Sequence, residues 1–151
     1  MRILNKSRLA GKEEQLLKNI KYRAWYEDSF DGIWKMANVR DIIWNCGVVA
    51  IDVFTDDNRL FYQPLNFKLM QSTGHRDIKR TKEHPKGQEI YAGDLVRVSS
   101  DKYIRIIEWS EDEASFKARM LPNETENIRP LYMNEEDFEV LGNIHENPDL
   151  L

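Results

Sequence analysis

Short runs of aromatic and β-branched residues, separated by turn-forming residues, occupy most of the chain after residue 20. In Ser115–Leu121, for example, the apolar Phe116, Ala118 and Met120 alternate with polar side chains. A period of two is typical of a strand that buries one face. The sequence therefore predicts a mainly β protein, a β-rich α+β fold built from short strands and hairpins.

Strands are predicted at six places: Lys21–Trp25, Val48–Phe54, Tyr91–Val98, Tyr103–Trp109, Ser115–Leu121 and Phe138–Ile144. Turns are predicted at Asp28–Gly32 and Ser110–Glu113, and Thr55–Asn58 is predicted to join Val48–Phe54 to Arg59–Tyr62 in a hairpin. We expect the strands between roughly residues 88 and 145 to close into a small SH3-like barrel, because closure removes exposed strand edges. The side chains predicted to lie in the core are Trp25, Val98, Ile106, Trp109, Phe116 and Val140.

The N-terminal segment has a different pattern. Leu9, Leu16, Leu17 and Ile20 are spaced to share one helical face, which predicts an amphipathic helix centred on Ser7–Leu17. An isolated helix of this length is marginally stable in water, so its apolar stripe needs a surface to dock on. We therefore divide the chain into a helical extension at residues 1–19 and a β-rich domain at 20–151, and we expect self-association through the extension.

Composition narrows the functional classes. The 151 residues carry 22 basic and 26 acidic side chains, a formal charge of -4, so no overall field attracts nucleic acid or an anionic membrane. The longest apolar run is too short to span a membrane and no apolar signal-peptide region is visible, which predicts a cytoplasmic protein. The single cysteine, Cys46, is interpreted as a small hydrophobic residue within a strand.

One segment is locally basic. Residues 71–87 are polar, contain Gly and Pro and show no apolar period, so they are interpreted as a long exposed loop. The loop offers candidate phosphate-binding side chains at Arg76, Lys79, Arg80, Lys82 and Lys86. The alternative is that these charges are simply solvated, as most charge runs are.

Few residue patterns point to chemistry. The turn at Gly93–Asp94 is interpreted as a structural corner, with a catalytic Asp94 as the minority hypothesis. His75, His84 and His145 lack metal-ligand spacing, so we predict no metal and no cofactor. Carboxylates cluster at Glu108, Glu111–Glu113 and Glu135–Asp137, but on predicted turns, where solvation is their usual role.

Three stretches resemble a known family. Lys21–Trp25 (KYRAW) is similar to a K-F-R-A-W opening. Met70–Gly74 and, after the basic loop, Gly87–Val96 are similar to M-Q-Y-T-G followed by G-K-E-I-Y-E-G-D-I-V. Val140–Leu151 is similar to V-I-G-N-I-Y-E-N-P-E-L-L. In this order the stretches resemble the YopX family of phage and prophage proteins; His75 and the longer loop after Asp77 depart from its pattern.

The resemblance implies a phage or prophage origin, a host bacterial cell as location, and a fold with SH3-like character at 20–151. It implies no established biochemical activity. Our first hypothesis is a non-enzymatic, self-associating accessory protein that binds a host or phage protein. The alternative is a nucleic-acid-binding accessory protein that uses the basic loop at 75–86, and a small hydrolase is the third possibility.

Overall fold

The computed structural model describes residues 21–55, 63–99, 102–121, 128–130 and 138–151. The described residues form ten strands and one short 3-10 helix: β1 (Tyr22–Glu27), β2 (Trp34–Asn45), β3 (Val48–Val53), β4 (Phe67–Arg76), β5 (Glu89–Tyr91), β6 (Asp94–Val98), β7 (Ile104–Ser110), β8 (Ser115–Met120), β9 (Ile128–Pro130), β10 (Phe138–Asn143) and η3 (Pro148–Leu150). The prediction of a mainly β protein is therefore confirmed. The predicted N-terminal helix lies outside the described residues.

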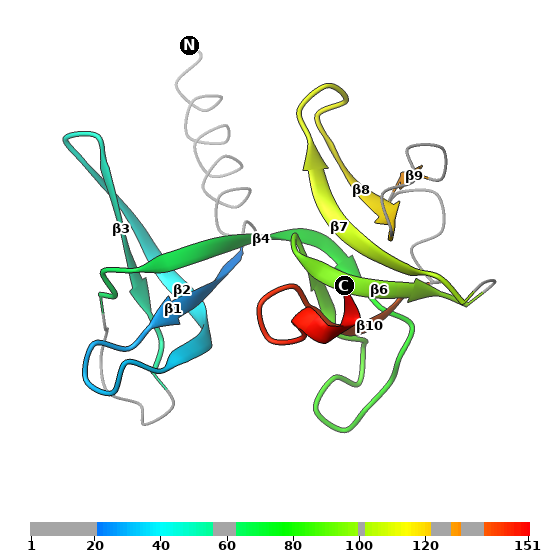
Figure 1. Ribbon diagram of the computed structural model, residues 1–151, viewed down its shortest axis with the longest axis horizontal. Helices are drawn as coiled ribbons and strands as arrows, with labels where there is room; N and C mark the ends of the chain where they lie inside the picture. The colour runs from blue at the N-terminus through cyan, green and yellow to red at the C-terminus, as the bar shows by residue number, and fades with distance from the viewer. Residues whose placement is uncertain (1–20, 56–62, 100–101, 122–127, 131–137) are drawn as a thin grey trace, which may run out of the picture.

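The strands form two five-stranded sheets, ordered β3-β2-β1-β4-β5 and β10-β6-β7-β8-β9. All the strand pairs are antiparallel. Strand β4 crosses the molecule, pairing with β1 at one end and with β5 at the other (Figure 1). A tight turn then leads from β5 into β6, so the backbone passes from one sheet to the other at this point.

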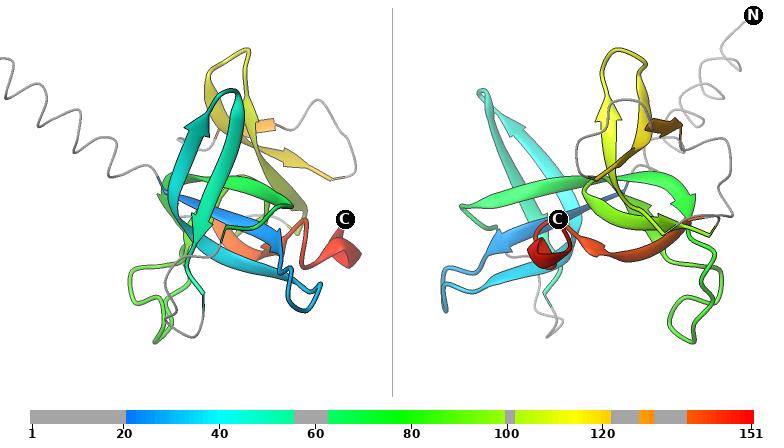
Figure 2. Two further views of the ribbon diagram at one scale, coloured as in Figure 1. Left: turned by 90° about the vertical axis from the view of Figure 1, so that its left-hand side faces the viewer. Right: turned by 45° about the vertical axis from the view of Figure 1, so that its right-hand side comes forward.

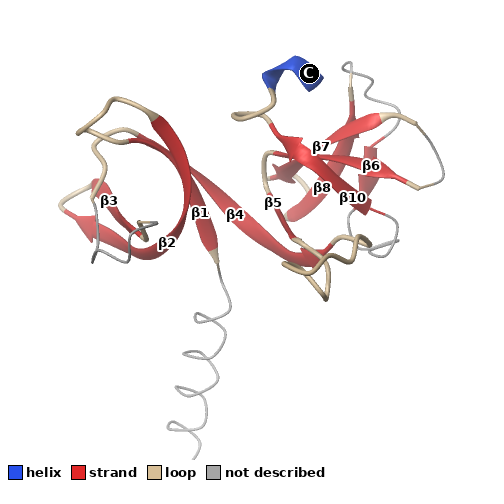
Figure 3. Ribbon diagram, turned by 90° about the horizontal axis from the view of Figure 1, so that it is seen from below, coloured by secondary structure: helices blue, strands red, loops and turns tan. Residues whose placement is uncertain are grey.

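The first sheet is strongly curved (Figure 3). Its core contains Ala24, Tyr26, Ile51 and Val53, and Phe67 packs against them from β4. Because Ala24 and Tyr26 are two residues apart on β1, they share one face of the sheet.

The predicted turn at Asp28–Gly32 is confirmed, and it leads into β2. The Asp28 and Asp31 carboxylates accept backbone hydrogen bonds from Phe30 and Ile33, at 3.0 and 2.9 Å. Lys35 Nζ donates to both carboxylates, which lowers the pKa of each.

A second core is made by Val96, Val98, Ile107, Ala118 and Phe138 of the second sheet together with Ile90 of β5. β6, β7, β8 and β10 lie within a few residues of their predicted positions, and residues 111–114 form the turn of the β7–β8 hairpin. The predicted closed barrel is not observed: β9 and β10 are the two ends of the strand order, and no described residue pairs them. The sheet is open. Its β7–β8 hairpin and the β2–β3 hairpin project to the same side of β4 (Figure 2).

Three strands were not predicted from the sequence: β2, β4 and the short β9. The longest strand, β2, was not predicted, because a bulge between Val39 and Asp41 interrupts its alternation. The residues interpreted as the start of a long loop, 71–76, instead form the second half of β4. There the pairing with β5 is irregular between Ser72 and Arg76, so the apolar period is lost although the strand continues.

Burial also corrects the predicted core. Val98 and Ile106 are buried, and Phe116 and Val140 pack against the second core as expected. Trp25 is half-buried. Trp109 was predicted wrongly: it is 50% exposed and makes an edge contact with Phe116, at 5.0 Å between ring centroids.

Candidate functional site

A tight corner joins the two sheets at Gly93 and Asp94. Gly93 has a φ of +89°, a conformation that favours glycine, and a Cβ at this position would lie 2.9 Å from Met70 Cε, so that methyl group would have to shift. Its N–H donates to the Ile107 carbonyl, at 2.8 Å. Asp94 begins β6 with its carboxylate fully buried, and Oδ2 accepts the backbone N–H of Tyr91, at 2.8 Å. The structure thus places both predicted turn residues at a junction in the backbone.

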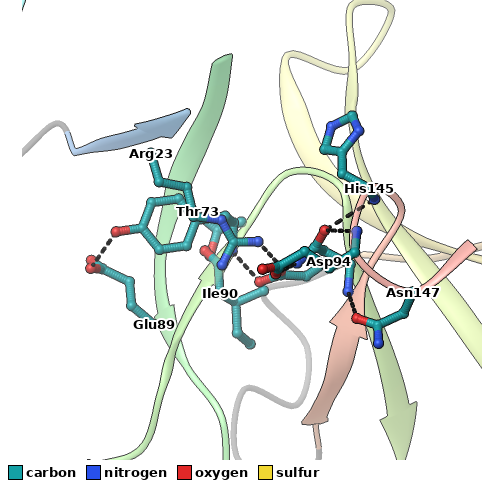
Figure 4. Close-up of polar contacts among 10 residues, drawn as sticks. Arg23, Thr73, Glu89, Ile90, Asp94, His145 and Asn147 are labelled. Atoms are coloured by element: carbon teal, nitrogen blue, oxygen red, sulfur yellow. Dashed lines mark hydrogen bonds and ion pairs between the residues drawn. The ribbon is translucent and has the colours of Figure 1, made fainter. Parts of the chain in front are cut away.

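Asp94 also holds a buried ion pair with Arg23 of β1 (Figure 4). The Arg23 side chain is 11% exposed, and its guanidinium carbon lies 4.5 Å from the centre of the Tyr91 ring, a cation–π contact. Burial raises the pKa of Asp94 to about 6, although Arg23 acts in the opposite direction. The pair therefore ties the first sheet to the second.

A second carboxylate lies on the other side of Tyr91. Glu89 of β5 accepts hydrogen bonds from Ser72 Oγ and Tyr91 Oη, at 2.9 and 3.1 Å, and Lys21 Nζ lies 3.6 Å away. Burial, with help from Glu89, raises the pKa of Tyr91 to about 12. The Tyr91 hydroxyl therefore stays protonated at neutral pH and acts as a donor.

The C-terminal turn supplies the third part of this region. The side-chain carbonyl of Asn143 accepts the N–H groups of His145 and Glu146, at 3.0 and 2.9 Å. This turn places the His145 ring against Trp25 of β1, with the rings nearly parallel and 6.1 Å between centroids. Burial lowers the pKa of His145, so the ring stacks in its neutral form at neutral pH.

The residues that carry the family resemblance thus meet in space. Arg23 and Trp25 come from the first stretch, Tyr91 and Asp94 from the second, and His145 from the third. The sequence identified these stretches but did not predict the ion pair between Arg23 and Asp94, because the two residues are 71 positions apart in the chain. The signal that could have suggested it was an arginine inside an apolar strand pattern and an aspartate inside an apolar corner.

A cleft of about 500 Å³ opens beside this region. Its walls come from β1, β2, the end of β3 and the 76–91 segment, which projects below β4 in Figure 1. The residues that line it are Arg23, Met36, Ala37, Asn38, Phe54, Thr55, Arg76, His84, Gln88, Glu89 and Tyr91. The cleft therefore combines charged, polar and apolar side chains from β1, β2, the residues after β3 and the 76–91 segment.

The segment predicted to be a loose basic loop is instead built around a buried aspartate. Asp77 is 2% exposed, and its carboxylate accepts the backbone N–H groups of Gln88 and Val140, at 2.7 and 3.2 Å. Backbone bonds from Asp77 to Gln88 and from Ile78 to Phe138 fix the segment to the second sheet. Residues 77–88 thus form a defined loop with its own internal anchor.

The five candidate phosphate-binding side chains have different surroundings. Arg76 Nη1 donates to the Gly87 carbonyl, at 2.9 Å, and Arg80 Nη1 donates to the Asp77 carbonyl, at 2.7 Å. Lys79 lies 3.6 Å from Glu139. Lys82 and Lys86 are exposed, and neither has an ion-pair partner among the described residues. Of the five candidate cations, Arg76 alone lines the cleft.

The other candidate residues are dispersed. Cys46 is exposed in the β2–β3 turn with a φ of +48°, so its interpretation as a strand hydrophobe was wrong. Glu108 pairs with Arg119, and Glu113 with Lys117, on the β7–β8 hairpin. Glu135–Asp137 lies outside the described residues. Among the described residues, no group of three His, Cys, Asp or Glu side chains is placed to hold a metal ion.

Comparison with known proteins identifies the family. The model of the family described as YopX protein matches residues 21–151, which include every described strand. The chain belongs to the YopX family. A search of curated proteins found no match to this YopX-family chain. In the part of the chain that the structure describes, no helix has the length and apolar character needed to cross a membrane.

Proposed function

We propose that this YopX-family chain is a non-enzymatic phage accessory protein that binds a partner protein through the cleft beside Arg23 and Tyr91. The cleft, with Phe54 at its edge, is the observation that carries the proposal. Phe54 is 53% exposed although it directly follows β3, and exposed aromatic side chains at a concave surface are typical of protein recognition.

The bonding of the charged groups supports binding rather than catalysis. The Arg23 and Asp94 charges neutralise each other, and Glu89 is held by Ser72 and Tyr91. A general acid or base needs a carboxyl that can reach substrate, whereas Asp94 is fully buried. These groups stabilise the walls of the cleft.

A matched pair of variants tests the proposal. The tagged wild type, Phe54→Ser and Phe30→Ser are used to capture proteins from nuclease-treated host lysate. Phe30 is the control because it is 89% exposed in the β1–β2 turn, outside the cleft. A protein captured by the wild type and Phe30→Ser but lost with Phe54→Ser supports the proposal. Equal capture by all three chains contradicts it.

Self-association is the second part of the proposed function. It rests on the apolar stripe of Leu9, Leu16, Leu17 and Ile20, which precedes the family-matched residues. Deletion of Met1–Asn19 is expected to lower the molar mass measured by light scattering. An unchanged mass at equal concentration would show that the extension does not join copies of the chain.

The alternative, nucleic-acid binding by the basic loop, has less support. Three of its five candidate cations already bond to the protein, and a net charge of -4 opposes approach of a polyanion. It predicts an affinity that falls steeply with salt, because each neutralised phosphate releases condensed counterions. An electrophoretic shift that is absent even at low salt would remove this alternative.

A further inference from the structure

The charged groups in the cleft wall differ in whether they are already paired. Arg23 is paired with Asp94, and Glu89 receives two hydrogen bonds from hydroxyl groups. Arg76 uses only Nη1, which donates to a backbone carbonyl, and no described carboxylate pairs with it. The Arg76 side chain is exposed at the end of β4. Its other two donor nitrogens, Nε and Nη2, make no hydrogen bond to a described residue. Arg76 is therefore the cleft cation that lacks an anion.

The shape of the Arg76 guanidinium indicates which anion it would bind. A guanidinium is planar and carries its N–H groups in a fixed fork, which matches the two oxygens of a carboxylate. His84 lines the same cleft and has its own ring nitrogens, so a second polar contact to the same anion is available from the 77–88 loop.

A second observation points into the same cleft. Arg23 Nε is buried and has no hydrogen-bond partner among the described residues. Buried donors in native proteins are nearly always bonded, and Arg23 is one of the residues that line the cleft, so this nitrogen adds an unsatisfied polar group beside the cleft.

The apolar part of the wall restricts the ligand further. Met36, Ala37 and the half-exposed Phe54 lie on the side formed by β2 and the end of β3. A ligand that fills the cleft must therefore present an apolar group beside its anion. Acidic peptides in which a carboxylate neighbours a large apolar side chain have this pattern.

We propose that the cleft binds an acidic segment of the partner protein, with Arg76 receiving a carboxylate and Phe54 contacting the neighbouring apolar side chain. This inference rests on the proposed function and names the chemistry of the partner. A nucleic acid fits less well, because Glu89 is in the same wall and Lys82 and Lys86 are not. A single carboxylate can avoid Glu89, whereas a chain of phosphates brings repeated negative charge to it.

The test uses fluorescein-labelled short peptides in which Glu alternates with Phe and Leu, and a Gln-containing counterpart of each. Binding to the full chain is measured by fluorescence anisotropy. The wild type is expected to bind the Glu peptide at least ~10-fold more tightly than the Gln peptide, a difference of about 1.4 kcal/mol. Arg76→Gln is expected to remove that preference.

Lys82→Gln is the matched control, because it removes one positive charge from the same loop outside the cleft. It is expected to keep the preference for the Glu peptide. Equal losses in Arg76→Gln and Lys82→Gln would show general electrostatic attraction and overturn the proposal. So would binding of neither peptide at about 1 mM, or tighter binding of a single-stranded oligonucleotide of the same length.

A second variant guards against a folding defect. Arg76→Lys keeps the charge but not the planar fork, and is expected to reduce the preference for the Glu peptide while the melting temperature stays close to that of the wild type. The two proposals can fail separately. If Phe54→Ser abolishes partner capture from lysate but Arg76→Gln does not, the protein-binding function stands and the acidic ligand is excluded.

Discussion

The two sheets have the same number of strands but differ in how their apolar side chains are used. Large exposed hydrophobic residues gather on the first sheet and its connections: Phe30, Ile33, Trp34, Ile43, Trp44, Phe54, Leu65 and Leu69. The second sheet has fewer such residues, and its core also takes in Ile90 from β5 and Phe138 from the strand that comes last in the chain. The comparison indicates that the second sheet supports stability, whereas the first sheet offers surface for contact.

The largest effect should come from the second core. Phe138 is 2% exposed, so Phe138→Ala should lower the free energy of unfolding by about 3 to 5 kcal/mol, because it removes buried surface and leaves a cavity. Urea unfolding followed by fluorescence measures the change. If the sheets unfold together, one transition shifts as a whole. A residual transition left in place would show that the first sheet is stable independently.

The junction between the sheets should show a pH dependence. The pKa of Asp94 is about 6 in the folded protein, against an ordinary value of 3.8 that applies to the unfolded chain. The folded state therefore binds the carboxyl proton of Asp94 more tightly than the unfolded state does. Its contribution to stability is complete below the lower value and is lost as the pH rises through about 6, a change of roughly 3 kcal/mol.

Asp94→Asn isolates this titration, since asparagine carries no charge at any of these pH values. The difference in unfolding free energy, wild type minus Asp94→Asn, should fall between about pH 4 and pH 7. A difference that stays flat or rises would contradict the raised pKa, whatever the constant cost of losing the bond to Arg23.

A smaller effect is expected where the second sheet is open to solvent. Trp109 is 50% exposed and contacts Phe116 by its edge, so Trp109→Ala should cost about 1 kcal/mol. Thermal unfolding of Trp109→Ala and Phe138→Ala under the same conditions compares the two losses of stability. A loss as large as that of Phe138→Ala would mean that Trp109 belongs to the core after all.

The smallest effect is expected at the loop charges. Lys82 is exposed and has no ion-pair partner among the described residues, so Lys82→Ala should change the unfolding free energy by less than about 0.5 kcal/mol. Arg80→Ala removes a bond to the Asp77 carbonyl and should cost more, about 1 kcal/mol. Equal values for the two variants would indicate that the loop gains no stability from its internal bonds.

How well the sequence predicted each region follows from its local pattern. β6, β7, β8 and β10 keep a regular apolar period or follow clear turn residues, and their positions were predicted within a few residues. β2 was missed because its bulge shifts the period near Arg40. β4 and the short β9 were also missed; the second half of β4 is polar and pairs irregularly with β5. Strand positions are thus readable where each strand satisfies its own pattern.

The candidate site was less predictable because it depends on pairs distant in the chain. Neither Arg23 nor Asp94 indicates its partner, and the cleft joins residues from Arg23 to Tyr91. The basic loop was noticed for its charge, whereas its defining residue is the buried Asp77. Sheet closure was also overestimated, since alternation within strands says nothing about whether the two end strands meet.

The division of β4 between two partners has a consequence for how fast the protein folds. Its first half must find β1, which begins 45 residues earlier (residue 22 against residue 67), and its second half then brings in β5. Such pairings cost loop-closure entropy before they yield any contact energy, so chains dominated by them fold in milliseconds to seconds rather than microseconds. The β10–β6 pairing spans a similar separation, so docking of β4 on β1 and of β10 on β6 are both expected to be slow steps. Substitutions at these pairings should slow refolding more than they speed unfolding.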